Sequence, residues 1–252
     1  MDLKKWEDHL DVILEEERET FLDNNEAELF IESPLKTREQ QKFQSREELL
    51  KTFKLEDASD QIEKALVIIR DMLPQFITDE EWNAVYEEFI NCDEALISYF
   101  EAVENEEIDI EVYVSIAEMC GISGETLKHC YELAQKLYED NDYSDARALF
   151  GFLAAICPET PEFWISSGMS AYQMGNFQEA IELYKIGQQL FPENVAFYIH
   201  AANSSIANND ISNAKIFLEK AKALIDLHSD YKKEWGDTYD FLKSRTINFK
   251  KQ

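Results

Sequence analysis

The chain has 252 residues, of which 45% are hydrophobic, so it is long enough for one large or two ordinary domains with buried cores. Its formal net charge is −28, and residues 1–126 hold most of the excess, with 35 acidic residues against 11 basic ones. An acidic surface of this kind repels phosphate backbones and anionic lipid headgroups. The composition therefore argues against nucleic-acid binding and against binding at a membrane surface.

The N-terminal residues and the cysteines indicate a compartment. The chain is charged from its second residue, so we expect no signal peptide, and no apolar stretch approaches the roughly 20 residues of a membrane helix. The cysteines form no CxxC pair, and we interpret them as small buried hydrophobic residues in a reducing compartment: Cys92, Cys120, Cys130 and Cys157. We therefore expect a cytoplasmic protein without membrane insertion.

The first 120 residues contain no glycine, and long stretches of them have apolar residues at helical spacing. We expect an acidic helical extension and linker at 1–48, where 32–48 is strongly polar, and a small helical unit at 49–120. Helix-start signals occur at Ser59-Asp60 and at Thr78-Asp79. The acidic charge of this half is either a solvated surface or a surface that attracts a basic partner.

The second half repeats itself every thirty-four residues. Small, large and turn-forming residues recur in phase, as in Ala146, Ala180 and Ala214, in Ala134, Gly168 and Ala202, in Phe150, Tyr184 and Leu218, and in Asn141, Gly175 and Asn209. This period and order are typical of tetratricopeptide (TPR) repeats, each of which is a pair of helices.

The phase of the repeats predicts the domain in detail. We expect a TPR domain at 121–252, with a first helix capped by Ser123, repeats at about 127–160, 161–194 and 195–228, and a capping segment at 229–250. The small residues let the two helices of a repeat approach closely, and the large ones fill the space between repeats. The predicted fold class is therefore all-α, with three tandem TPR helix pairs and a C-terminal capping helix preceded by an acidic helical region.

Catalytic chemistry has no candidate residues in this sequence. The four histidines show no metal-ligand spacing with one another or with the cysteines, and no glycine-rich phosphate loop occurs. No set of nucleophile, base and orienting group can be written down. We therefore predict a protein that is not an enzyme and that uses no metal and no cofactor.

The first helix of each repeat lines the inner surface of such a solenoid. Positions 2, 5, 9, 12 and 13 of a repeat fall on one helical face and predict a groove lining. These positions are Lys128, Tyr131, Gln135, Tyr138, Glu139, then Glu162, Ile165, Met169, Tyr172, Gln173, then Ala196, Ile199, Asn203, Ile206 and Ala207. The mixture suits an extended, partly apolar peptide, although the same residues could instead serve core and inter-repeat packing. The clamp that some TPR domains use for a C-terminal carboxylate needs Lys and Asn at positions 5 and 9 of one repeat. The first repeat has Tyr131 and Gln135 there and the second has Ile165 and Met169, so no such clamp is visible.

The stretch from about Ile116 to Lys250 resembles the class II type III secretion chaperones of the LcrH/SycD/IpgC type. The match is carried by the spacing of Tyr131, Tyr138 and Tyr143 and by the element His200-Ala201-Ala202 in the third repeat. The resemblance implies a bacterial cytosolic chaperone that binds an extended segment of a hydrophobic translocator in its groove. It also implies that His200 and Asn203 lie in that groove, although Asn203 replaces an acid that is usual there. The predicted peptide-binding residues are Lys128, Tyr131, Gln135, Tyr138, Ile165, Met169, Tyr172, Ile199, His200 and Asn203.

The sequence thus predicts a chaperone that keeps a secreted hydrophobic translocator or effector soluble before export. The alternative is a TPR scaffold or regulator whose acidic N-terminal half docks a basic component of the secretion apparatus. The acidic half could also fold back over the groove. A homodimer is left open, because an acidic segment more than a hundred residues long stands where the family has a short N-terminal helix.

Overall fold

The computed structural model describes residues 55–92, 94–95, 98 and 115–248. The extension expected at 1–48 lies outside these residues. The chain divides into two compact units, Met1–Asp60 and Gln61–Gln252, and nearly all of the described structure belongs to the second. The domain boundaries expected between residues 48 and 49 and between residues 120 and 121 stay predictions. The described residues form helices and no strand, in the order α4 (Leu55–Met72), η1 (Leu73–Gln75), α5 (Asp79–Ile90), α7 (Ile116–Met119), α8 (Gly124–Glu139), α9 (Tyr143–Ile156), α10 (Pro161–Gln173), α11 (Phe177–Leu190), α12 (Val195–Ala207), α13 (Ile211–Leu227) and α14 (Ser229–Asn248).

Helix starts in the acidic half follow one of the two predicted signals. Thr78 caps α5 as expected, and Glu81 completes a capping box by accepting from the Thr78 backbone N–H at 2.7 Å. The prediction at Ser59-Asp60 is wrong, because α4 already begins at Leu55.

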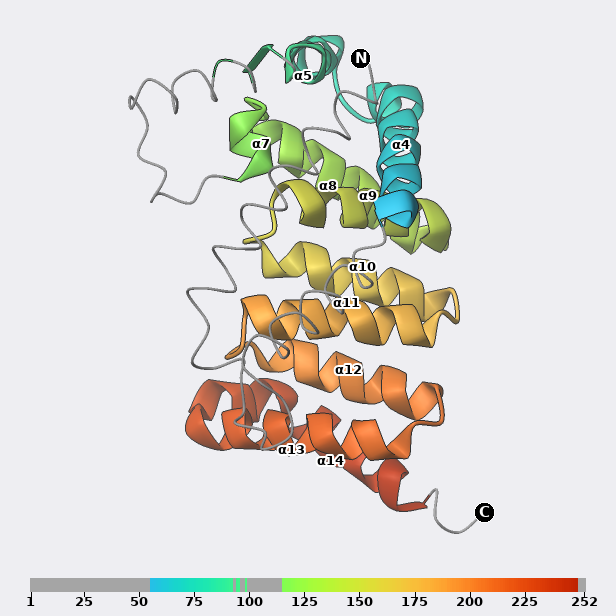
Figure 1. The fold of residues 1–252 in the computed structure, drawn as a ribbon, viewed down its shortest axis with the longest axis vertical. Coiled ribbons are helices and arrows are strands. Elements are labelled where there is room, and N and C mark those ends of the chain that lie inside the picture. The colour runs from blue at the N-terminus through green and yellow to red at the C-terminus, as the bar shows by residue number, and fades with distance from the viewer. Residues whose placement is uncertain (1–54, 93, 96–97, 99–114, 249–252) are drawn as a thin grey trace, which may run out of the picture. The chain divides into compact units, whose positions relative to one another are not determined.

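Helices α8 to α13 form the three predicted TPR pairs, and α14 caps them (Figure 1). Each helix packs mainly on the next one along the chain, and the first helix of the second repeat, α10, also contacts that of the third, α12. Ser123 caps α8 as expected, accepting from the Thr126 backbone N–H at 3.2 Å. The fold class predicted from the thirty-four-residue period is confirmed.

The turn inside each repeat is built in the same way three times. Asn141, Gly175 and Asn209 have φ of 67°, 81° and 60°, the left-handed conformation that glycine and asparagine tolerate best. The next residue then donates its N–H back to the last turn of the first helix, as from Asp142 to the carbonyl of Leu137 at 2.9 Å. The periodic turn signals in the sequence therefore end each first helix at an equivalent position.

Small residues lie where the sequence predicted close approach of helices. Ala146, Ala180 and Ala214 are fully buried, with 0% of their surface exposed. At Gly168 even a methyl group would not fit, since a Cβ would lie 2.4 Å from Cε1 of Tyr184. The glycine therefore brings the Tyr184 ring directly against α10.

Large residues at the starts of α10 and α12 tie each repeat to the loop before it. The indole Nε1–H of Trp164 donates to the carbonyl of Pro158, and thirty-four residues later the hydroxyl of Tyr198 donates to the carbonyl of Pro192, each at 3.0 Å. These side chains fill space between repeats, as expected, and also satisfy a loop carbonyl.

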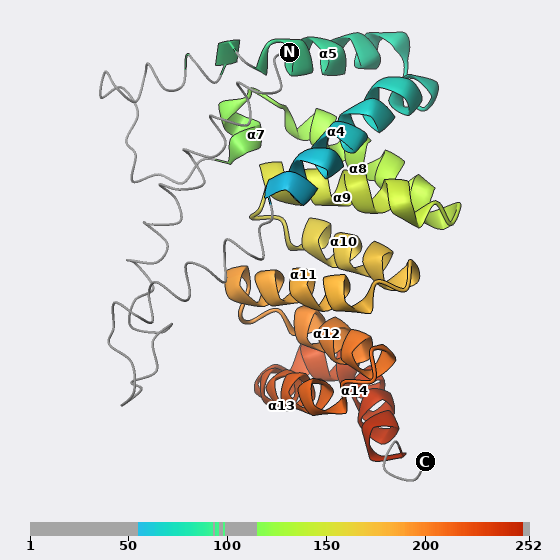
Figure 2. The ribbon, with the colours of Figure 1, turned by 45° about the vertical axis from the view of Figure 1, so that its right-hand side comes forward.

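The acidic helices are fastened to the first repeat (Figure 2). Lys64 of α4 forms an ion pair with Asp145 of α9, with a Nζ to Oδ1 distance of 2.7 Å. The rings of Phe89 and Phe152 lie 6.2 Å apart, which joins α5 to α9. These contacts fix the orientation of α5 relative to the repeats.

Candidate functional site

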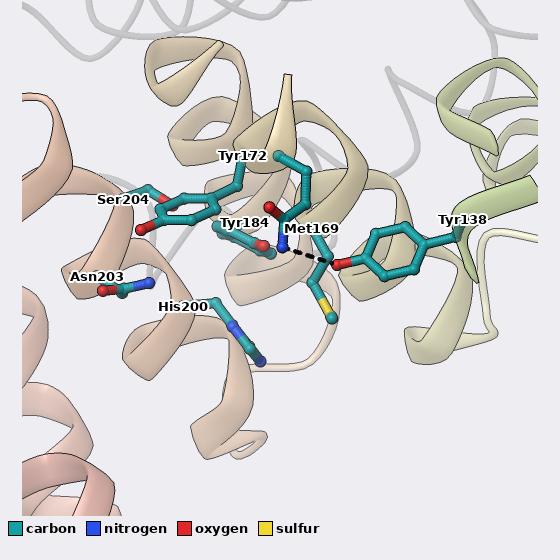
Figure 3. Close-up of a pocket in the computed structure, with 8 residues that line it drawn as sticks. Tyr138, Met169, Tyr172, Tyr184, His200, Asn203 and Ser204 are labelled. Carbon is teal, nitrogen blue, oxygen red and sulfur yellow. Dashed lines mark hydrogen bonds between the residues drawn. The ribbon is translucent and has the colours of Figure 1, made fainter. Parts of the chain in front are cut away.

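A pocket opens on the face formed by the first helices α8, α10 and α12, which we call the groove face. It has a volume of about 150 Å³ and is lined by Tyr138, Met169, Tyr172, Gln173, Tyr184, His200, Asn203 and Ser204 (Figure 3). A cavity of about 150 Å³ is large enough for a ring of the size of benzene. The pocket therefore suits one branched or aromatic side chain at a time.

Tyr184 of α11 and His200 of α12 lie together in the pocket. Only 1% of the Tyr184 surface is exposed, and its ring stacks on the imidazole with a centroid distance of 5.5 Å and an interplanar angle of 25°. Tyr184 reaches the groove face because Gly168 leaves room for its ring. We had expected Tyr184 only to fill space between repeats. The signal that could have found it is the glycine where the other repeats have alanine.

Two aromatic pairs frame the pocket and follow the repeat. Tyr138 packs on Tyr143, and Tyr172 packs on Phe177, both with ring centroids 5.2 Å apart. In each pair the partner is the first residue of the second helix, so the ring on the groove face is held by its own repeat. The Nε2–H of Gln173 donates to the Tyr138 hydroxyl at 3.2 Å, which links the first repeat to the second.

Helix α14 closes the third-repeat end of the pocket. Trp235 meets His200 edge to face at 5.8 Å, and Arg245 donates from Nη1 to Oδ1 of Asn203 at 3.3 Å. The amide at position 203 thus accepts from a cation that belongs to the cap. The pocket residues therefore contact the cap as well as one another.

Charge is absent from the pocket lining even though the whole chain is strongly acidic. Burial lowers the pKa of His200 to about 4, so its imidazole is neutral at pH 7, and the other lining side chains are tyrosine, methionine, serine or amide. Burial also raises the pKa of Tyr184, which keeps its hydroxyl protonated. The site therefore offers apolar surface and neutral hydrogen-bonding groups to a ligand.

We predict that His200 makes stability fall in mild acid. An unfolded histidine has a pKa near 6.5, so the unfolded chain takes up a proton before the folded chain does as the pH falls. The stability related to His200 is then complete above about pH 6.5 and is lost progressively towards pH 4, by at most about 3 kcal/mol. Urea unfolding of wild type and His200→Phe between pH 7.5 and 4.5 measures this loss, since phenylalanine keeps the stack on Tyr184 without titrating. Parallel pH curves for the two proteins would contradict the assignment.

Five of the ten predicted site residues come together in this pocket: Tyr138, Met169, Tyr172, His200 and Asn203. The other five do not line it. Lys128 is exposed and lies 3.7 Å from Glu132 in an ion pair, and Gln135 is also exposed. Ile165 is half-buried. These three residues thus lie outside the pocket.

Two of the predicted site residues pack against other side chains of the protein. Half-buried Tyr131 contacts Phe150 and Phe163, with ring centroids 5.6 and 5.5 Å away, so much of its ring surface serves packing. Ile199 has only 2% of its surface exposed. The expectation that Ile199 faces an open groove is corrected, because the packing around α12 at the capped end of the domain buries it.

The described part of the chain offers neither a metal-ligand cluster nor a membrane-spanning helix. Within residues 55–92, 94–95, 98 and 115–248, no cluster of three or more His, Cys, Asp or Glu side chains is placed to hold a metal ion. None of the helices that the structure describes has the length and apolar character needed to cross a bilayer.

Comparison with known proteins adds relatives to this geometry. Residues 161–194 match the tetratricopeptide repeat family. The Low calcium response locus protein H of Yersinia pestis is 28% identical over 118 residues, which are 47% of this chain and 70% of that protein. The translocator chaperone SycD of Yersinia enterocolitica is 26% identical with a TM-score of 0.49, over 53% of this chain and 99% of that one. A T3SS complex from Aeromonas hydrophila, 19% identical over 55% of this chain and 93% of its own, has a TM-score of 0.50 and is alike in fold. The resemblance to LcrH-type proteins expected from the sequence is therefore confirmed over the repeat region.

Proposed function

Because the repeat region is homologous to type III secretion chaperones of the LcrH and SycD type, we propose that this protein is such a chaperone. It binds an extended, partly apolar segment of a hydrophobic translocator or effector on the groove face, in the cytoplasm, and keeps that client soluble before export. The observation that carries the proposal is the neutral pocket built from all three repeats. A client with apolar side chains fits such a pocket, whereas a strongly charged peptide has no countercharge among its lining residues.

The residues proposed for client binding fall into two groups. Tyr138, Met169, Tyr172, His200 and Asn203 line the pocket, and Tyr184 adds a ring that the sequence did not assign to the site. We keep Lys128, Tyr131, Gln135 and Ile165 as candidate contacts beyond the pocket, because each retains exposed surface. A bound segment that fills the pocket and continues past it along α8 and α10 would reach them. Its backbone would use the tyrosine hydroxyls and amides as hydrogen-bonding partners.

Co-expression with a candidate hydrophobic translocator tests the proposal. We expect the translocator to move from the insoluble to the soluble fraction and to co-purify with the chaperone. A segment near the client's N-terminus should be sufficient for binding, as the family resemblance implies. The test should include every candidate translocator encoded beside the same secretion system. If all of them stay insoluble both with and without this protein, the result would contradict a chaperone function.

A further inference from the structure

Helix α5 is held firmly by one of its faces. Val85 has 1% of its surface exposed and Cys92, just beyond the helix, has 4%. Phe89 lies next to Phe152 of α9, and Oε2 of Glu88 accepts from the backbone N–H of Ser123 at 3.0 Å. Helix α5 therefore packs by the face that carries Val85 and Phe89.

An apolar stripe flanks this buried face. Trp82, Tyr86 and Ile90 stand four residues apart and therefore share one side of the helix; we call them the α5 stripe. Tyr86 is 50% exposed and Ile90 is 56% exposed, while half-buried Trp82 lies against Tyr86 with ring centroids 5.9 Å apart. Neighbouring exposed aromatic and aliphatic side chains are typical of protein interaction sites rather than of plain solvated surface.

Acidic side chains border the α5 stripe. At 100° per residue, Asp79 lies in line with the stripe, one turn before it, and Glu80 and Glu87 lie alongside it; all three are exposed. No Lys or Arg occurs between Asp71 and Leu127, where there are sixteen acidic residues. The border is therefore not neutralised by nearby bases of its own segment.

We infer that the α5 stripe is a docking surface for a basic amphipathic helix of a partner protein. The apolar face of such a helix would cover Trp82, Tyr86 and Ile90, and its flanking Lys or Arg side chains would meet the acidic border. Charge complementarity selects a basic occupant over the acidic segments of the same chain, because residues 1–35 hold 12 acids against 3 bases and residues 96–114 hold six acids and no base. Residues 36–54 hold six bases against three acids, so a deletion of 36–54 that tightens peptide binding would make this segment the occupant in place of a partner. A second copy carries the same net charge of −28.

This surface is separate from the groove face. The α5 stripe belongs to a helix outside the repeats, whereas the pocket is lined by residues of α8, α10, α11 and α12 (Figure 2). The two sites share no residue, so one chain could hold a client on the groove face and a basic partner on α5. The inference does not rest on the proposed chaperone function, and either can fail alone.

A designed peptide tests the inference on the full-length protein. The probe is a fluorescent 18-residue peptide of leucine and lysine with leucines at i, i+3, i+4 and i+7, followed by anisotropy. We expect the double variant Tyr86→Ser/Ile90→Ser, which keeps the charge, to weaken binding at least tenfold. Glu80→Gln/Glu87→Gln should weaken it several-fold and make it less sensitive to salt. Ile216→Ser, at a 52% exposed isoleucine of α13, is the matched control and should leave binding unchanged.

Several results would overturn the inference. A scrambled peptide of the same composition that binds equally well would show attraction by net charge alone. An unchanged affinity in Tyr86→Ser/Ile90→Ser would exclude the stripe, and loss of peptide binding in Tyr172→Ala would move the site to the pocket. Self-association in sedimentation that only the stripe variant abolishes, with peptide affinity unchanged, would make a second copy the occupant. Circular dichroism melting confirms that each variant is folded before it is compared.

Discussion

Replacing Gly168 with alanine is expected to lower the free energy of unfolding by up to about 2 kcal/mol, the cost of overpacking less the gain in helix propensity, and to weaken client binding. The new Cβ would lie 2.4 and 2.6 Å from Cε1 and Cζ of Tyr184, which is almost completely buried, so the ring would have to shift. Overpacking of a dense core costs about 1–3 kcal/mol, and the better helix propensity of alanine recovers at most about 1 kcal/mol of it. Because the Tyr184 ring stacks on His200, its displacement would also deform the pocket.

The same substitution at Gly236 is the matched control. Gly236 also lies within a helix, and a Cβ there would meet no atom within 4 Å. We expect Gly236→Ala to leave stability unchanged or to raise it by up to about 1 kcal/mol through helix propensity. Urea unfolding of the two variants side by side measures the difference, and calorimetric titration with a client segment measures binding. Equal stability of the two variants would show that Tyr184 can move away at no cost.

Replacing Tyr172 with alanine is expected to lower affinity for a client segment at least about thirtyfold. Its ring borders the pocket and is held by Phe177, so a client gains a rigid aromatic contact without paying for its ordering. Central aromatic residues of this kind contribute about 2 kcal/mol or more when truncated, and each 1.4 kcal/mol is a factor of ten. The side chain is only half-buried, so its removal should cost folding less than removal of Tyr184 would.

The matched control for Tyr172→Ala is Tyr86→Ala, which removes an exposed tyrosine from a helix outside the repeats. Client affinity should be unchanged by that substitution, and binding of the basic peptide should be unchanged by Tyr172→Ala. Titration of both ligands against both variants separates the two surfaces. Client binding that survives Tyr172→Ala at wild-type affinity would place the client elsewhere on the protein.

Half of the predicted binding residues reached the pocket, and the reasons differ for the rest. Periodicity placed Tyr138, Met169 and Tyr172, at position 9 or 12 of a first helix, on one face, and each of them lines the pocket. The same rule also selected Ile199, which is buried instead. The position of a residue along a helix sets which way its side chain points. It does not say which other parts of the chain pack over that side chain.

The start of α4 shows a similar limit at the level of local structure. Ser59-Asp60 is a good capping pair, yet the helix begins at Leu55. Thr78-Asp79 is a comparable pair and does cap α5, because the preceding η1 and its Pro74 interrupt the chain there. A capping signal therefore marks a helix start only where the chain has already left the previous helix.

The sequence by itself determined the architecture of the repeat domain. A period of thirty-four residues is read off the chain directly, and the turns at Asn141, Gly175 and Asn209 depend only on which residues tolerate a positive φ. The tertiary structure alone decided what lies at the site. It brought Tyr184 against Gly168, joined α14 to the pocket through Arg245 and Asn203, and left the α5 stripe uncovered. These outcomes depend on contacts between residues far apart in the chain, and local periodicity carries no information about such contacts.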